Sequence, residues 1–126
     1  MYHNQMKERF NPGTDLTAHV EATVTGKTFL RYAGAMKKGL ISVAPANPGE
    51  AIAGVCKYNA EADDLVGVAR GSGRVVTVTS AAALTAGTAV EVAANGHATP
   101  ATSGVTVGWA VDNTDEGDDA LISLAH

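Results

Sequence analysis

The feature that most constrains this chain is the close spacing of its turn signals, which suits short strands joined by tight turns. The stretch from Leu84 to Trp109 shows the pattern. Thr88–Val92 alternates polar and apolar residues, as a half-buried strand does. Asn95-Gly96 then favours a tight turn, because both residues tolerate positive φ. Val105-Thr106-Val107 alternates again, so we expect a β-hairpin here with its second strand at Val105–Val107.

From Leu16 onward, the rest of the chain shows the same close spacing of turn signals. Its apolar or alternating runs are separated by Gly-, Pro- or Asn-rich turns, and such spacing is typical of a sandwich or barrel. We therefore predict an all-β fold, a compact β-sandwich or barrel of about ten short strands. The further strand candidates are Thr17–Val24, Thr28–Tyr32, Leu40–Ala44, Ala51–Lys57, Leu65–Ala69, Arg74–Thr79, Val107–Val111 and Ala120–Ala125.

The first residues differ from the rest. Residues 1–15 are polar and contain the turn signal Asn11-Pro12-Gly13. We interpret them as an extended N-terminal arm, either disordered or ordered only against a partner. Residues 16–126 then form the β domain.

The two parts of the β domain resemble each other, which indicates an internal duplication. Residues 38–44 match residues 86–92, and residues 53–61 match residues 107–115, with an Asp pair following in each part. Gly54 and Gly108 match within this alignment. Each marks a bulge or a close approach of another backbone within a strand.

Charge is distributed unevenly along the chain. The formal net charge is −4, yet no Lys or Arg follows Arg74. An acidic C-terminal part argues against a nucleic-acid surface there, because phosphate contacts need clustered cations. The asymmetry would allow a basic edge of one copy to meet the acidic edge of another, or an acidic partner. The alternative is scattered, solvated charge.

Composition also limits which classes of protein the chain can belong to. The apolar residues are mostly Ala and Val, so a single core is thin and assembly with other copies would add burial. No apolar run reaches the roughly 20 residues that cross a bilayer, and the N-terminus lacks the apolar region of a secretory signal. The single cysteine, Cys56, excludes an intramolecular disulfide and favours a reducing compartment.

Candidate catalytic and metal-binding residues are few. Cys56 could act as a nucleophile with His19 or His97 as base, but a cysteine in an apolar strand is more often a core residue. The loop Asp112–Asp119 has oxygen ligands for a hard cation but lacks the glutamate expected of a calcium loop. Gly71-Ser72-Gly73 precedes no helix and so is no phosphate loop. We predict no catalytic residue, no metal site and no cofactor.

Several segments together resemble the small capsid cement or head-decoration proteins of tailed bacteriophages. The resemblance covers roughly residues 38–124 and leaves out the N-terminal arm. It is carried by Ala53-Gly54-Val55, Gly71–Thr79 (GSGRVVTVT), Leu84–Val92 (LTAGTAVEV), Gly104–Ala110 (GVTVGWA) and Asp119–Leu124 (DALISL).

The resemblance implies a non-enzymatic protein that binds the outside of a phage head. Such proteins attach to the major capsid protein, usually as homotrimers, and brace neighbouring capsid subunits against the pressure of the packaged DNA. It implies synthesis in the cytoplasm of the host bacterium and a final location on the capsid exterior. Neither nucleic acid nor a membrane is expected as a direct partner.

Two sets of contact residues follow as hypotheses. Apolar, aromatic and basic side chains on the polar arm are expected to bind the major capsid protein; these are Tyr2, Met6, Arg9 and Phe10. A pairing between opposite charges is expected at the subunit interface; its members are Arg70 and Arg74 with Asp115, Glu116, Asp118 and Asp119.

Two other functions stay open at this stage. One is a β-rich ligand- or carbohydrate-binding module on a virion, which would usually display an aromatic platform; the aromatic candidates are Phe29, Tyr32, Tyr58 and Trp109. The other is a small hydrolase that uses Cys56 and a histidine.

Overall fold

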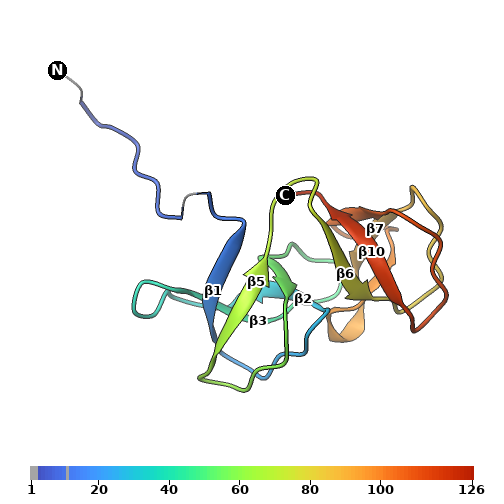
Figure 1. The fold of residues 1–126 in the computed structure, drawn as a ribbon, viewed down its shortest axis with the longest axis horizontal. Coiled ribbons are helices and arrows are strands. Elements are labelled where there is room, and N and C mark those ends of the chain that lie inside the picture. The colour runs from blue at the N-terminus through green and yellow to red at the C-terminus, as the bar shows by residue number, and fades with distance from the viewer. Residues whose placement is uncertain (1–2, 11) are drawn as a thin grey trace.

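The computed structural model describes residues 3–10 and 12–126, and it confirms an all-β fold (Figure 1). The described residues form ten short strands and one 3-10 turn, η1. The strands are β1 (Asp15–Val20), β2 (Phe29–Tyr32), β3 (Ile41–Pro45), β4 (Gly54–Cys56), β5 (Leu65–Ala69), β6 (Val75–Thr79), β7 (Ala89–Val92), β8 (Ala98–Pro100), β9 (Gly108–Ala110) and β10 (Asp119–Leu124); η1 (Ala94–Gly96) joins β7 to β8. Within this part of the chain, no helix has the length and apolar character needed to span a membrane.

The first five strands close into a barrel, which we call barrel 1, in the order β1-β3-β2-β4-β5. β1 closes it by pairing parallel with β3 and antiparallel with β5. Alternate residues of these strands point inward, as a half-buried sheet requires. They form a core of small aliphatic side chains that includes Ala18, Val20, Leu30, Val43, Cys56, Val66 and Val68.

The last five strands form a second sheet, which we call sheet 2, in the order β6-β10-β9-β7-β8. Its two end strands, β6 and β8, meet only through one parallel bridge between Ser80 and Ala98. Phe29, Ile52 and Val55 of barrel 1 join the core of sheet 2, where they pack with residues such as Val78, Val90 and Ile122.

The two halves repeat one pattern of strand pairing. β1–β5, β2–β3, β2–β4 and β4–β5 pair antiparallel, and so do β6–β10, β7–β8, β7–β9 and β9–β10. The parallel pairing of β1 with β3 recurs as the Ser80–Ala98 bridge. Even a side-chain contact recurs, because Asn59 Oδ1 accepts from the Gly26 amide and Asn113 Oδ1 accepts from the Ala86 amide.

This repetition supports one of the two segment matches and corrects the other. Residues 53–61 correspond to residues 107–115, as predicted. Residues 38–44 do not correspond to residues 86–92, because β7 occupies the place of β2 and β8 occupies the place of β3. Gly87, the glycine on which the incorrect match was based, is equivalent to Lys27. The Lys27 amide donates to the carbonyl of the last residue of β4, and the Gly87 amide donates to that of the last residue of β9.

Gly54 and Gly108 both lie where another backbone approaches closely. A Cβ on Gly54 would lie 2.7 Å from the carbonyl oxygen of Ala69, and one on Gly108 would lie 2.5 Å from that of Ser123. These distances are too short for a side chain. The predicted close approach is therefore confirmed at both positions.

The predicted hairpin has a different second strand. β7 pairs with β8 at Ala98–Pro100, and residues 105–107 form no strand. The turn at Asn95 and Gly96, with φ of 62° and 72°, reverses the chain at once, so the partner strand begins two residues later. Val107 instead donates its amide to the carbonyl of Val90.

Candidate functional site

The N-terminal arm extends away from barrel 1 and carries the predicted capsid-binding residues (Figure 1). Met6 is 78% exposed, and Arg9 is exposed as well. Tyr2 lies outside the described residues. The arm therefore presents an apolar side chain and a cation to the surroundings, with the β domain behind them.

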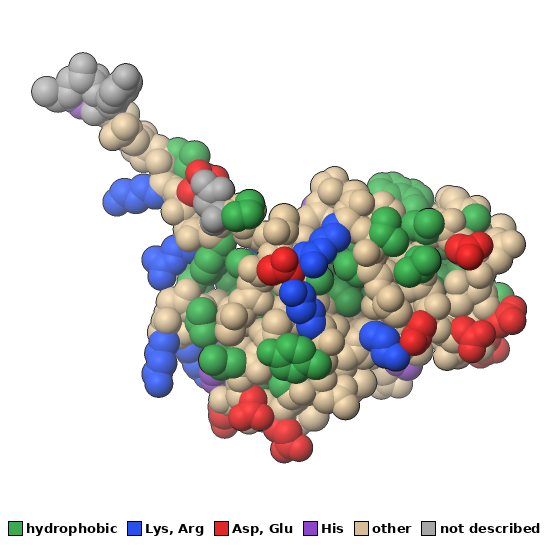
Figure 2. Space-filling view, in the orientation of Figure 1, with side chains coloured by type: hydrophobic (Ala, Val, Ile, Leu, Met, Phe, Trp, Pro, Cys, Tyr) green, Lys and Arg blue, Asp and Glu red, His purple; other side chains and the backbone are tan. Residues whose placement is uncertain are grey.

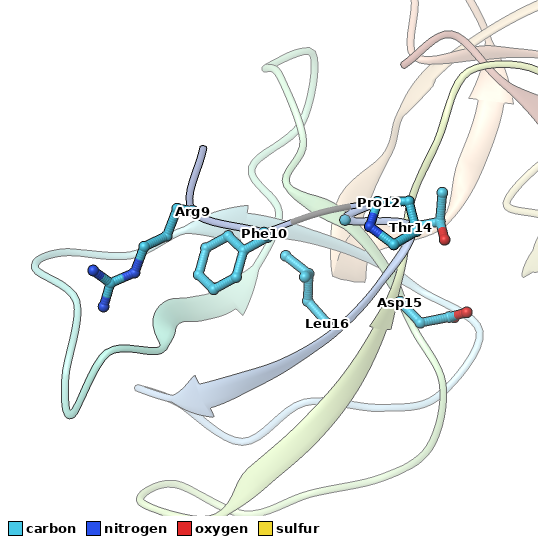
Figure 3. A pocket seen from close by; sticks show the side chains of 7 residues that line it. Arg9, Phe10, Pro12, Thr14, Asp15 and Leu16 are labelled. Atoms are coloured by element: carbon cyan, nitrogen blue, oxygen red, sulfur yellow. The ribbon is translucent and has the colours of Figure 1, made fainter. Parts of the chain in front are cut away.

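Phe10 holds the end of the arm on barrel 1. Its half-buried ring packs with Leu16 against the core of barrel 1. Figure 3 shows the two side chains next to each other, in a shallow hollow that Arg9 and Pro12 also line. Because part of the ring is used within the chain, Phe10 anchors the arm and offers only its remaining surface to a partner.

A turn after Phe10 directs the chain into β1. Gly13 has a φ of 76°, and a Cβ there would lie 2.7 Å from the carbonyl oxygen of Phe10. Only glycine fits this conformation and this approach without strain. The turn that the sequence predicts at this point thus fixes where the arm leaves the barrel.

Arg70 and Arg74 hold the first residues after that turn. The carbonyl oxygen of Thr14 accepts from the Arg70 amide at 2.9 Å and from Arg74 Nη1 at 2.6 Å. Arg74 Nη2 also lies 2.9 Å from Asp15 Oδ1. Hydrogen bonds from Lys57 and Arg74 lower the pKa of Asp15. Arg74 thus connects the start of β6 to the base of the arm.

The predicted subunit-interface residues already have partners within the chain in several cases. Arg70 Nη1 donates to the Tyr32 hydroxyl at 3.0 Å. Asp119 pairs with Lys27 at 2.8 Å and accepts from the Thr79 hydroxyl, and the hydrogen bond from Lys27 lowers the pKa of Asp119. Asp115, Glu116 and Asp118 are exposed at the end of sheet 2. Pairing across subunits stays a prediction. On the acidic side, these three exposed carboxylates are its best candidates.

The candidate nucleophile, Cys56, lies in the core of barrel 1. Its Sγ is 3.1 Å from the carbonyl oxygen of Tyr58, and burial raises the pKa of the thiol. A buried, neutral thiol fills space but reacts poorly as a nucleophile. Across residues 3–10 and 12–126, no group of three or more His, Cys, Asp or Glu side chains could hold a metal ion.

Sequence reasoning missed two features that the structure shows. Phe29 lies in the strand expected at Thr28–Tyr32 and is an aromatic candidate on the sequence, yet its side chain completes the core of sheet 2 from barrel 1. Glu91 was passed over, yet it is a buried carboxylate whose Oε1 accepts from the amide and hydroxyl of Thr102 at 3.1 and 2.9 Å. The sequence signal for this site is the position of Glu91 itself, an acidic residue inside the alternating run Thr88–Val92.

The comparison with known protein families decides the relationship. The family described as phage cement protein matches residues 10–125. The chain belongs to the phage cement protein family. It is therefore a protein associated with the phage head.

A solved structure shares the fold of this cement protein. It is the N base of the head fiber gp8.5 in bacteriophage phi29, with 19% sequence identity and a TM-score of 0.74. The match covers 88% of this chain and 92% of the other. A search of curated proteins gives no match.

Proposed function

We propose that this protein is a capsid decoration protein that binds the outer surface of a phage head and stabilises it. In this proposal it bridges subunits of the major capsid protein, acts as a homotrimer and has no enzymatic activity. The observation that carries the proposal is an exposed arm, held at its base, on a β domain of the phage cement protein family.

The arm provides the contact with the capsid. Met6 and Arg9 offer an apolar and a cationic group that a partner surface would cover, and Tyr2 stays a predicted contact. Ordering an extended segment costs about 1–2 kcal/mol of backbone entropy per residue. Three arms on one homotrimer would offset that cost, because the second and third arms bind at a high effective concentration.

The anchor at the base of the arm reduces the same cost. Phe10 packs on barrel 1, and the Thr14 carbonyl accepts two hydrogen bonds from Arg70 and Arg74. The arm therefore starts from a fixed point and direction. Only the residues before Phe10 lose freedom when the arm binds.

Removal of the arm tests the proposal. Deletion of residues 1–13 should leave the β domain folded, because Thr14 and its hydrogen bonds remain, and should abolish binding to purified heads. Circular dichroism checks the fold and sedimentation with heads measures the binding. Decoration of heads by the truncated protein would refute the role of the arm.

A matched pair of substitutions locates the contact within the arm. Met6→Ser should weaken binding to heads by about tenfold, because an apolar anchor is lost. Lys7→Ser, at the neighbouring position, should change binding little. Equal losses from the two substitutions would contradict a specific role for Met6.

The alternative of a carbohydrate-binding module has one supporting observation, the exposed Trp109. Its exposed large neighbours are the aliphatic residues Val75, Val111 and Leu121, so the described surface offers no row of aromatic rings around it. Binding to a glycan array that is lost in Trp109→Ser would favour this alternative over decoration.

A further inference from the structure

Sheet 2 leaves an apolar face uncovered. Val75, Trp109, Val111 and Leu121 lie on its outer side, over β6, β9 and β10, and each is between 44% and 50% exposed. The pairing places Trp109 and Val75 on either side of Ser123 in one row. Figure 2 shows hydrophobic side chains gathered over β10. We call these four residues the Trp109 face.

The internal repeat shows what covers this position in the other half. Trp109 pairs with Ala89 next to the pair of Gly108 with Val90, and Val55 pairs with Phe29 next to the pair of Gly54 with Leu30. Trp109 therefore occupies the place of Val55. Val55 and Phe29 are buried because sheet 2 packs on them. The same outer position is thus a protein contact in barrel 1 and is bare in sheet 2.

Charge indicates which surface would cover it. A hollow next to the Trp109 face is lined by Leu121 and by acidic residues that include Asp112, Asp115 and Asp118. No Lys or Arg lies in the chain after Arg74, and Lys27, a cation that borders the hollow, is paired with Asp119 at 2.8 Å. A fitting partner surface would have apolar side chains flanked by cations.

Barrel 1 has such a surface at its far end from sheet 2. Leu40 and Leu65 line a hollow there together with Lys37, Lys38, His19 and Asp63. Lys37 is paired with Glu21 at 2.8 Å, so Lys38 is the better candidate to meet an acidic partner. The loop before β3, which carries both lysines, projects away from sheet 2 in Figure 1. We call this surface the Leu65 hollow.

We propose that the Trp109 face of one copy packs on the Leu65 hollow of a second copy. The contact is head-to-tail, like the contact between barrel 1 and sheet 2 within the chain, and head-to-tail contacts close into rings when the rotation allows it. Trp109 and Leu121 bury against Leu40 and Leu65, and Asp118 lies toward Lys38. The proposal rests on the proposed homotrimer and names the surfaces that hold it together.

Sedimentation of the purified protein tests the contact without phage heads. Wild type should self-associate, and Trp109→Ser should weaken self-association by about tenfold or more, as expected for a central aromatic residue. Tyr58→Ser removes an aromatic ring of similar exposure from barrel 1 and should leave association unchanged. A monomeric wild type, or equal association of wild type and Trp109→Ser, would overturn the proposal.

A charge exchange identifies the two surfaces independently of folding defects. Lys38→Glu and Asp118→Lys should each weaken association, and the double variant should restore it because the pair is re-formed with reversed signs. Additive losses in the double variant would overturn the pairing. Because no heads are present, failure here leaves head binding by the arm untouched, and failure of head binding leaves this result untouched.

Discussion

Gly54 and Gly108 occupy equivalent places where the chain has no room for a side chain. Gly108→Ala would place Cβ 2.5 Å from the Ser123 carbonyl oxygen, which belongs to the backbone of β10. The strands would have to separate, and we expect a loss of about 1–3 kcal/mol in the free energy of unfolding, as in other overpacked sites. Chemical denaturation measures it.

Gly67→Ala is the control for this substitution. Gly67 also lies in a strand, but the atoms nearest to a Cβ there belong to side chains and not to the backbone, the first being Lys57 Cδ at 3.0 Å. A side chain can shift by a few tenths of an ångström more easily than the backbone of a paired strand, so the loss should be well below that of Gly108→Ala. Similar losses at the two positions would show that close backbone approach is not the cause.

Glu91 connects β7 to the segment that follows β8. It is 8% exposed, and hydrogen bonds from Thr102 lower its pKa. A lowered pKa in the folded state means that the stabilisation is present at neutral pH and is lost as pH falls through the folded pKa. Glu91→Gln should therefore lower Tm at about pH 7, and the difference from wild type should shrink toward about pH 3.

The exposed residue Glu50 provides the comparison. Its exposed side chain accepts a hydrogen bond from Asn47 at 3.2 Å, so Glu50→Gln should change Tm little at either pH. A Tm difference for Glu91→Gln that stays constant between the two pH values would contradict the assignment of the effect to the charged carboxylate.

At the scale of elements, Phe29 links the two halves. It starts β2 of barrel 1, yet its side chain lies in the core of sheet 2, near the seam where β6 and β8 meet only at Ser80 and Ala98. Gly96, just before β8, packs on the backbone of Phe29. Phe29→Ala should cost about 3–5 kcal/mol of stability.

Hydrogen exchange can locate the part of the molecule that loses stability in Phe29→Ala. In Phe29→Ala the amides of β6 and β8 should exchange faster than those of β1 and β3, because the opened cavity lies in sheet 2. Leu30→Ala, at the next residue, empties the core of barrel 1 instead and should give the reverse pattern. Uniform acceleration in both variants would mean that the halves unfold as one unit.

Local patterns in the sequence predicted most of these elements but not how they pair. Alternation and turn residues located strands such as Leu65–Ala69, which matches β5, because strand formation and tight turns depend on neighbouring residues. The pairing of β7 with β8, rather than with residues 105–107, depended on the geometry of one turn. The closure of barrel 1 by a parallel β1–β3 pair joins distant segments and left no local signal.

The candidate site also combines features that local sequence predicts with contacts that it does not predict. The polar composition of the arm and its turn at Asn11-Pro12-Gly13 were visible in the sequence. The hydrogen bonds of Arg74 to Thr14 and Asp15 were not, because they join residues far apart in the chain. The same long-range placement pairs Lys27 with Asp119, a carboxylate that the sequence also offers for a pairing between subunits.

At the scale of the whole molecule, the charge asymmetry follows the two halves. Barrel 1 and the arm carry every Lys and Arg except Arg74, which directly precedes β6, and sheet 2 carries none. Figure 2 shows most basic side chains on the arm side and acidic side chains at the sheet 2 end, with further acidic side chains on barrel 1. A molecule with opposite ends of opposite charge favours head-to-tail assembly, and this assembly should weaken as salt screens the charges.

Stabilisation of the phage head is the proposed function. Heads purified without it, then incubated with full-length protein or with residues 14–126, can be heated while DNA release is followed by a fluorescent dye. Heads with the full-length protein should release DNA at a higher temperature than bare heads, and heads with the truncated protein should behave as bare heads do. Release at the same temperature from bare heads and from heads that carry bound full-length protein would contradict the account.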